Sequence, residues 1–352
     1  MDGSSFWTTP ILLNCDTATS DYVKPVLVDS FNHSVNYLRL SVTDRCNERC
    51  MYCMPEESQV WLPPSDILSY EEVLRLVKIS VSLGITKFRV TGGEPLVRKD
   101  VLFFLSELHR IPGVEDVGLT TNGTLLADNA LALRRTGLRT LNISLDSLNP
   151  TTYAKITGRD FLPRVLDGIE AAVAAKFEWI KLNMVLIRGQ NDMDVDSLIK
   201  FAWDRKIVLR FIELMPVSTR EVLSEQTFIS VGEIKKRINS HTPLTPDPSH
   251  KGNGPAVYYT DEKTQTLKLG FIGAMTNLHF CDSCNKLRLT AEGKLRPCLG
   301  NHDEYDVREA LRNGATDEVI ATIIKSVVAR KPEMHQFRDL YVPDRKMIAI
   351  GG

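Results

Sequence analysis

The sequence predicts an α/β fold: an incomplete (βα)6 TIM-like barrel followed by a smaller C-terminal module. Three observations lead to this prediction. Short apolar, β-branched runs recur between residues 37 and 214, segments with helical spacing separate them, and polar residues alternate with apolar ones in several runs. Strands that alternate with helices in this way form a parallel sheet, because each helix carries the chain back to the end where the previous strand began.

The predicted elements alternate regularly along this region. The first helix begins behind Ser69, a good N-cap residue, and Glu72 stands three positions later to complete a capping box. The predicted strands are residues 37–42, 87–91, 117–121, 140–145, 179–187 and 208–214, and the predicted helices are residues 70–79, 100–109, 128–136, 162–176 and 194–204.

Polar residues two positions apart on a strand share one face of the sheet. A closed eight-stranded barrel fills its interior with branched apolar side chains, so rows of polar residues favour a wider, incomplete barrel that holds a polar ligand. The alternative is that the rows face solvent at a sheet edge, although both faces of a parallel sheet are usually covered. The rows are Lys87, Arg89 and Thr91; Asn142, Ser144 and Asp146; and Lys181 with Asn183.

The rest of the chain divides around the partial barrel, which we place at residues 36–215. Residues 1–35 show no periodicity and are predicted to be an N-terminal leader. Residues 216–265 are rich in Ser, Thr, Pro and Gly, with one helical piece at 231–238, and are predicted to be a connector. Residues 266–352 form the C-terminal module, with a strand at 267–272, helices near 306–312 and 317–329, and a terminal Gly351-Gly352.

The composition is that of an ordinary globular protein, with 43% hydrophobic and 25% charged residues. The net charge of −1 provides no general basic field, so we expect neither nucleic acid nor a membrane as a partner. No run reaches the ~18 apolar residues of a membrane span, and no secretory signal is recognisable. Six of the seven cysteines form two tight sets, which favours a reducing cytoplasm and leaves Cys15 as a plain thiol.

The first cysteine set, Cys46, Cys50 and Cys53, follows the first predicted strand directly. Three thiolates at this spacing can hold three corners of a cubane iron–sulfur cluster. The fourth iron would then lack a protein ligand and could bind a substrate or cofactor. The alternatives are a structural zinc site, which prefers four ligands in paired sets, and three incidental thiols.

A second set of three cysteines lies in the C-terminal module. His279 could complete a Cys3His zinc site, so zinc is a serious alternative here. Lys286 and Arg288, which share one face of a strand, favour instead a cluster whose open iron binds an anionic, nitrogen-bearing ligand such as a nucleotide. The alternative for these two cations is a solvated face. The set consists of Cys281, Cys284 and Cys298.

A glycine pair, Gly92-Gly93, precedes Glu94-Pro95 at the carboxyl end of the second predicted strand. Active sites of βα barrels form at this end of the strands, and paired glycines let the backbone approach a ligand closely. Peptide groups exposed there could bind an amino-acid-like moiety, whereas an ordinary turn is the alternative.

Together these motifs resemble the radical S-adenosylmethionine (SAM) superfamily, which has the Cys46-x3-Cys50-x-Tyr52-Cys53 pattern after the first strand and the Gly92-Gly93-Glu94-Pro95 pattern after the second. The second cysteine set and the Gly-Gly end are similar to one family within it, the GTP 3′,8-cyclases of molybdenum-cofactor biosynthesis. The resemblance covers about residues 29–352 and rests on residues 38–46, 88–98, 120–123, 142–148, 210–215 and 280–290.

The resemblance implies two [4Fe–4S] clusters and SAM as cosubstrate. The open iron of the first cluster, on Cys46, Cys50 and Cys53, would bind the amino and carboxylate groups of SAM. A second cluster on the other cysteine set, Cys281, Cys284 and Cys298, would bind guanine, which decides the zinc question in favour of iron and sulfur. The terminal Gly351-Gly352 is implied to reach the active site. The implied SAM contacts are the backbone at Tyr52 with Gly93, Ser144 and Met215, and the implied GTP contacts are Arg39, Arg89, Thr120, Lys181, Lys286 and Arg288.

The resemblance further implies that GTP is converted to (8S)-3′,8-cyclo-7,8-dihydroguanosine 5′-triphosphate, an early step of molybdopterin synthesis. The implied partners are an electron donor and the next pathway enzyme, cyclic pyranopterin monophosphate synthase. The sequence leaves the oligomeric state open, with a homodimer as one option. Two other functions compete with this one. A peptide-modifying radical SAM enzyme would usually carry more cysteines in its auxiliary module, and a non-enzymatic iron–sulfur or zinc-dependent protein would serve only in binding.

Overall fold

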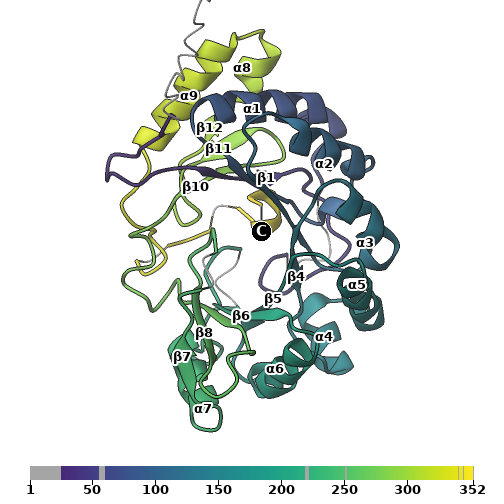
Figure 1. The fold of residues 1–352 in the computed structure, drawn as a ribbon. Helices are drawn as coiled ribbons and strands as arrows, with labels where there is room; N and C mark the ends of the chain where they lie inside the picture. Colours follow the sequence, from purple (N-terminus) through teal and green to yellow (C-terminus); the bar gives the residue numbers. More distant parts are fainter. Residues whose placement is uncertain are drawn as a thin grey trace, which may run out of the picture.

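The computed structural model describes residues 25–54, 60–218, 222–249, 252–339, 341–343 and 345–351. Most of the predicted leader, Cys15 and Gly352 therefore lie outside the described residues. Figure 1 looks into a strongly curved sheet with helices on its outer side and the end of the chain near its middle.

Six parallel strands build the predicted partial barrel, and each lies beside the strand that precedes it in the chain. The first and last residues of every strand lie within one residue of the predicted bounds, because short β-branched runs between turn residues define a buried strand well. They are β1 (Tyr37–Ser41), β2 (Lys87–Thr91), β3 (Asp116–Thr121), β4 (Thr140–Ser144), β5 (Trp179–Leu186) and β6 (Val208–Glu213).

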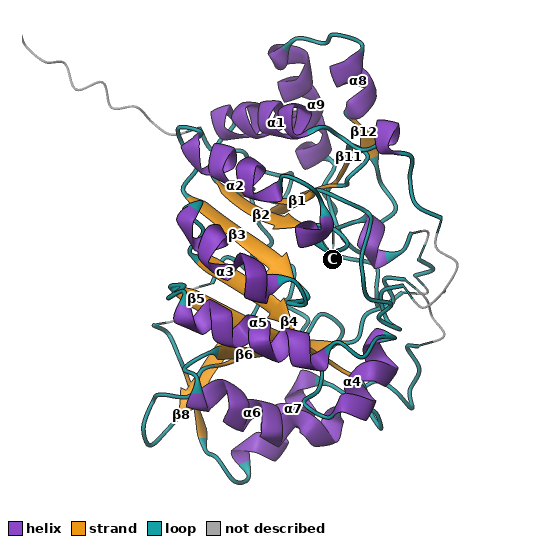
Figure 2. Cartoon of the chain, turned by 90° about the vertical axis from the view of Figure 1, so that its right-hand side faces the viewer, coloured by secondary structure: helices purple, strands orange, loops and turns teal. Residues whose placement is uncertain are grey.

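Helices cover the outer face of these strands (Figure 2). The predicted capping box is present, since Ser69 Oγ accepts a hydrogen bond from the Glu72 amide and the Glu72 carboxylate accepts one from the Ser69 amide at 2.7 Å. The sequence prediction missed α4 (Pro150–Thr157), although Asn149 caps it and proline occupies its first turn. The other helices and 3-10 turns are α1 (Tyr70–Ser82), α2 (Val101–Arg110), α3 (Leu126–Arg135), α5 (Leu162–Ala174), α6 (Val195–Asp204), η1 (Pro64–Asp66), η2 (Pro95–Val97) and η3 (Asp192–Asp194).

The sheet continues past both edges of the barrel with strands from the C-terminal part of the chain. β10 (Lys286–Leu289) pairs in parallel with β1, and β9 (Leu269–Ile272) pairs in parallel with β6. Further strands beyond these two are β7 (Leu244–Pro246), β8 (Val257–Asp261), β11 (Lys294–Arg296) and β12 (Tyr305–Asp306). The strand order is therefore β12-β11-β10-β1-β2-β3-β4-β5-β6-β9-β8-β7. Both ends of the barrel sheet thus receive residues that lie far away in the sequence.

The predicted connector, residues 216–265, contains α7 (Val231–Asn239), β7 and β8. β8 pairs with β9 and β7 pairs with β8, so both strands extend the sheet. No helix among the described residues is long and apolar enough to cross a membrane. The remaining elements are α8 (Arg308–Arg312), α9 (Asp317–Ala329) and η4 (Met347–Ala349).

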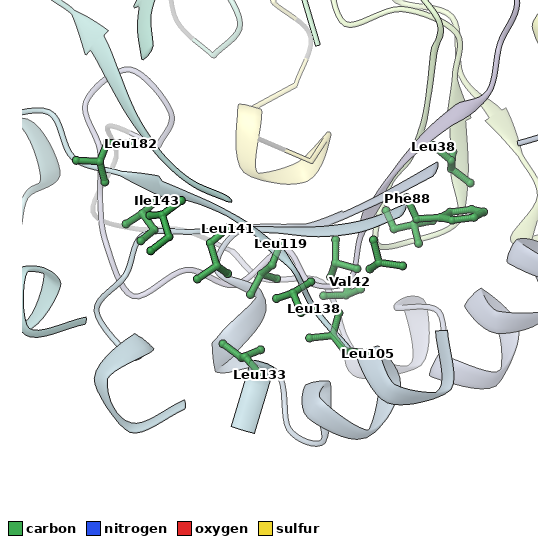
Figure 3. Packing of buried hydrophobic residues seen from close by; sticks show 14 of the residues in the cluster. Leu38, Val42, Phe88, Leu105, Leu119, Leu133, Leu138, Leu141, Ile143 and Leu182 are labelled. Carbon is green, nitrogen blue, oxygen red and sulfur yellow. The ribbon is translucent and has the colours of Figure 1, made fainter. Parts of the chain in front are cut away.

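Apolar side chains fill the space between the barrel strands and the helices. Figure 3 shows Phe88 of β2 and Leu141 of β4 among them, together with Leu105 of α2 and Leu133 of α3. Because side chains alternate along a strand, the residue after Phe88, Arg89, faces the concave side and lines the cavity there. The members of the predicted polar rows that line this cavity are Arg89, Thr91, Asn142, Ser144, Lys181 and Asn183. These rows therefore face the barrel interior, and the alternative of a solvent-facing sheet edge is wrong, although Lys87 and Asp146 do not line the cavity.

Candidate functional site

A cavity of about 360 Å³ lies on the concave side of the sheet. It brings together every residue that the sequence predicted for cluster, SAM or GTP binding, although these residues span positions 39 to 298. Those residues are Arg39, Cys46, Cys50, Tyr52, Cys53, Arg89, Gly93, Thr120, Ser144, Lys181, Met215, Cys281, Cys284, Lys286, Arg288 and Cys298.

The first cysteine set lies in the loop that follows β1, against the C-terminal end of α4. The amides of Arg49 and Met51 donate to the carbonyls of Thr157 (2.8 Å) and Ile156 (2.9 Å), so the missed helix α4 holds this loop in place. Within the loop, the amide of Cys53 donates to the Cys50 carbonyl at 2.9 Å and forms a turn. These hydrogen bonds bring the cysteines of the loop to one side of the cavity.

The donor chemistry of this set fits an iron–sulfur cluster. None of the three cysteines has a disulfide partner. Burial raises the pKa of the Cys46 thiol to about 12 and raises the pKa of Cys50 and Cys53 as well. Buried thiols of this kind become thiolates only when a positive centre binds them, as the iron of a cluster does.

Buried carboxylates surround the same loop. Glu48 accepts a hydrogen bond from the Tyr153 hydroxyl, and burial raises the pKa of Glu48 to about 8. Burial also raises the pKa of Glu94 to about 7, while its oxygens accept hydrogen bonds from the Thr121 hydroxyl (2.9 Å) and the Asn122 amide (2.6 Å). Glu94 thereby fastens the glycine motif after β2 to the end of β3.

Gly93 is required by its packing against the cysteine loop. Its amide donates to the carbonyl of Thr43 at 2.7 Å, and a Cβ atom on Gly93 would come within 2.2 Å of the Arg45 carbonyl oxygen. A side chain at this position would push away the segment that leads into Cys46. The glycine motif is therefore more than an ordinary turn, because it sets the position of the first cysteine set.

Two buried oxygen atoms on the cavity wall lack a hydrogen-bond partner within the described residues. They are Oγ1 of Thr120 and Oδ1 of Asn142, which stand opposite each other on β3 and β4. Such atoms cost free energy unless a ligand or water satisfies them. This part of the wall is therefore suited to a polar ligand.

Cationic side chains from neighbouring strands crowd the same cavity. Arg39 pairs in register with Arg89 on one side and with Arg288 on the other, so like charges lie side by side. Burial lowers the pKa of Arg39 to about 10 and that of Arg288 to about 9, while burial together with Arg210 and Arg89 lowers the pKa of Lys181 to about 7. Like charges this close repel one another, so this wall of the cavity is suited to a polyanionic ligand.

The last described residue contacts two of these cations. The carbonyl oxygen of Gly351 accepts hydrogen bonds from Nη2 of Arg39 at 3.2 Å and from Nη1 of Arg288 at 3.1 Å. The Gly351 end of the tail therefore reaches the cavity, as the resemblance implied.

The second cysteine set lies across the cavity, where the Cys284 amide donates to the Cys281 carbonyl at 2.9 Å. His279, the fourth ligand of the zinc alternative, is 83% exposed and its ring contacts Asp282 instead. Among the described residues, no three His, Cys, Asp or Glu side chains are grouped to hold a single metal ion. His279 therefore does not join the set, and its three thiols, which have no disulfide partner, suit a cluster.

The environment of Cys284 differs from that of its neighbours. Burial raises the pKa of Cys281 and Cys298. Burial opposes ionisation of Cys284 too, but the charges of Lys331 and Lys286 outweigh it and hold the pKa of this thiol below its usual value.

Three residues of this region were missed by the sequence analysis. Arg210 of β6 lines the cavity and donates to Asn183 Oδ1 at 2.6 and 2.9 Å; its signal was a charged residue at an inward position of an apolar strand. Glu213, fully buried, accepts hydrogen bonds from the amides of Val231, Met275 and Thr276, and thus ties β6 to the segment before Cys281. Lys331 follows α9 and has no local signal.

Two family models match the chain. The Radical SAM superfamily model matches residues 40–202, and the Molybdenum Cofactor Synthesis C model matches residues 207–337. The chemistry of the radical SAM superfamily depends on an iron–sulfur cluster and SAM.

Curated relatives match over almost their whole length. The GTP 3′,8-cyclase of Thermodesulfovibrio yellowstonii is 45% identical over 329 residues, which is 92% of this chain and 99% of that protein. The GTP 3′,8-cyclase of Moorella thermoacetica is 43% identical over 324 residues, again 92% of this chain and 99% of the relative.

Solved structures of Streptococcus suis SuiB share the fold. SuiB bound to S-adenosylmethionine has a TM-score of 0.56, and SuiB bound to precursor peptide SuiA has 0.58, both at 15% identity. These likenesses cover 91% and 88% of this chain, and 78% and 68% of SuiB. At this identity they show the radical SAM fold alone. From the two family models and the near-complete match to curated relatives, the chain belongs to the GTP 3′,8-cyclase family of radical SAM enzymes in molybdenum-cofactor biosynthesis.

Proposed function

We propose that this chain converts GTP to (8S)-3′,8-cyclo-7,8-dihydroguanosine 5′-triphosphate with SAM as cosubstrate. One observation carries the proposal: a single cavity holds a cysteine set at each side and buried cations from adjoining strands between them. A triphosphate would bring negative charge to these cations, and arginine binds phosphate oxygens through two parallel hydrogen bonds.

Cys46, Cys50 and Cys53 would hold the first [4Fe–4S] cluster, and Gly93, Ser144, Met215 and the backbone at Tyr52 would contact SAM. When bound, the cluster and SAM supply reductive cleavage of the sulfonium and removal of the ribose 3′ hydrogen. The protein holds this end of the cavity with its own contacts. The Tyr52 hydroxyl donates to Asp146 Oδ2 at 2.7 Å, and the Val185 amide donates to Asp146 Oδ1 at 2.8 Å, which ties the cysteine loop to β5.

The GTP would bind between the two cysteine sets. Arg39, Arg89, Lys181 and the newly found Arg210 would bind the triphosphate, while Lys286 and Arg288 lie beside the second set and would meet the nucleotide there. Thr120 would use its unpartnered hydroxyl oxygen as well. Cys281, Cys284 and Cys298 would hold a second [4Fe–4S] cluster that binds the base. Fixing both ends of the nucleotide places the ribose between them, and such positioning contributes much of the rate in reactions of this kind.

We extend the proposal to the setting of the enzyme. It would work in the cytoplasm as a homodimer, receive electrons from a one-electron donor, and deliver its product to cyclic pyranopterin monophosphate synthase. The division into a leader (1–35), a partial barrel (36–215), a connector (216–265) and a C-terminal module (266–352) is also part of the proposal.

An anaerobic assay tests the function. The protein is reconstituted with iron and sulfide and incubated with SAM, dithionite and GTP, and 5′-deoxyadenosine and cyclised nucleotide are quantified. We expect both products in equal amounts. Formation of 5′-deoxyadenosine that depends on an added peptide and not on GTP would contradict the proposal and favour the peptide-modifying alternative.

A further inference from the structure

A lysine at the second cysteine set stands apart from the other cations of the cavity. Lys331 follows α9 and is only 4% exposed. Its Nζ donates a hydrogen bond to Sγ of Cys284 at 3.3 Å and to the carbonyl oxygen of Pro297 at 3.1 Å. Since Pro297 precedes Cys298, this one ammonium group joins the two segments that carry the second set.

In the described part of the chain, the hydrogen-bond acceptors of Lys331 Nζ are these two atoms, and neither belongs to a carboxylate. A buried ammonium is costly unless an anion or a good acceptor compensates it. The acceptors here are one carbonyl oxygen and the sulfur of Cys284, which is one of the three proposed cluster ligands. A buried lysine in this position is suited to the negative charge that a bound cluster would bring to the second set.

The first cysteine set receives a different kind of donor. Among the described residues, its sulfurs accept hydrogen bonds from neutral groups, the Glu48 amide at 3.5 Å and Nδ2 of Asn122 at 3.9 Å, both directed at Cys46. The reduction potential of an iron–sulfur cluster rises with hydrogen bonds to its sulfurs and with positive charge nearby. The two sets therefore offer their clusters unequal surroundings.

We propose that Lys331 is a positioning residue of the second cysteine set, which holds Cys284 toward Cys298 and raises the reduction potential of the cluster there above that of the first cluster. This inference rests on the proposed second cluster. Its consequence is that an external reductant reduces the second cluster at a potential where the first cluster remains oxidised.

Potentiometric titration followed by electron paramagnetic resonance tests the inference on the full chain with both clusters. A chain carrying Cys46→Ala, Cys50→Ala and Cys53→Ala isolates the signal of the second cluster. We expect the second cluster to be reduced at the higher potential. In Lys331→Met, the ratio of reduced to oxidised second cluster at the wild-type midpoint should fall at least tenfold, which corresponds to about 59 mV for one electron.

Matched variants separate charge from hydrogen bonding. In Lys331→Arg the reduction potential of the second cluster should stay close to that of the wild type, and in Lys331→Gln it should lie between the wild-type and Lys331→Met values. Lys325→Met, which removes an exposed lysine of α9, should leave this potential unchanged. An unchanged potential in Lys331→Met, or a second cluster with the lower potential in the wild type, would overturn the inference. Loss of the second cluster from both Lys331→Met and Lys331→Gln would also overturn it, because Lys331 would then serve assembly alone.

The same samples distinguish failure of the inference from failure of the proposed function. If the wild-type protein binds iron and sulfide for one cluster only, the second cluster of the proposed function is wrong. If it binds two clusters and substitution of Lys331 leaves the reduction potential of the second cluster unchanged, the proposed function is retained and the proposed role of Lys331 is wrong.

Discussion

The guanidinium group of Arg89 lies over Gly118, its partner in register on the neighbouring strand β3. A Cβ atom on Gly118 would stand 2.0 Å from Nη1 and 2.2 Å from Cζ of Arg89. Nε of Arg89 also donates to the Tyr37 hydroxyl at 3.0 Å. A glycine in the middle of a strand marks such a close approach, and here it makes room for a cation of the proposed GTP site.

Gly118→Ala should therefore weaken GTP binding by about ten- to a hundredfold, because a charged hydrogen bond is worth about 1.5–3 kcal/mol and the new methyl group displaces Arg89. Equilibrium dialysis with GTP measures the effect. Gly232→Ala, where the added Cβ finds ordinary contacts, is the control. In a chain that already carries Arg89→Ala, Gly118→Ala should reduce GTP affinity little further. If the two substitutions instead lower the binding free energy additively, the link between these residues is wrong.

Cys281→Ser should separate the two halves of the proposed reaction. Without the second cluster the nucleotide loses its orientation, so cyclisation should fall by at least about 10²-fold while SAM cleavage continues. The measurement is the ratio of cyclised nucleotide to 5′-deoxyadenosine. Cys46→Ser should abolish both products and Cys15→Ser neither. Equal cyclisation by Cys281→Ser and the wild type would remove the substrate role of the second set.

GTP binding should take up a proton at Lys181 above neutral pH. Burial, with Arg210 and Arg89, lowers the pKa of Lys181 to about 7, so at pH 8 this side chain is mostly neutral before binding. A triphosphate beside it favours the ammonium form and raises the pKa again. Binding should thus consume up to about one proton at pH 8 and less at pH 6, where Lys181 is already charged, and affinity should fall as the pH rises above 7.

Calorimetry in buffers of different ionisation enthalpy counts that proton. Lys181→Met should bind GTP more weakly and without the uptake at pH 8. Uptake of the same size in this variant would assign the proton to another group.

Glu213→Gln should destabilise the fold by about 3 kcal/mol, since the buried carboxylate accepts several hydrogen bonds and an amide nitrogen would face some of those donors. Urea unfolding of the apo-protein measures the loss, with the exposed Glu262→Gln as the control. If both variants unfold at the same urea concentration, Glu213 does not hold β6 to the segment before Cys281.

The barrel strands were predictable because their signal is local. Each is a short run of apolar and β-branched residues, and strict alternation places Arg89, Asn142 and Lys181 on the inner face. The short helix α4 was not predicted because its eight residues carry a weak apolar pattern, and its sequence signal was limited to Asn149-Pro150 at its start.

Residues that act across long sequence distances had no such signal. The pairing of β10 with β1 could not be read from either strand, since each is merely apolar on one face and cationic on the other. Lys331 stands after an ordinary helix, and only the fold brings it to Cys284. The resemblance to a known family supplied the proposed ligand sets, whereas the residues that support them required the structure.

The pairing of β1 with β10 also has a consequence during synthesis. β1 leaves the ribosome early, yet its neighbour on one side begins at Lys286, which is made roughly ten to fifty seconds later at ~5–20 residues per second. For that time one edge of β1 offers unpaired backbone groups to any other strand. The strand that finally covers this edge carries Lys286 and Arg288, so the nascent chain closes its sheet and acquires these two cations in the same event.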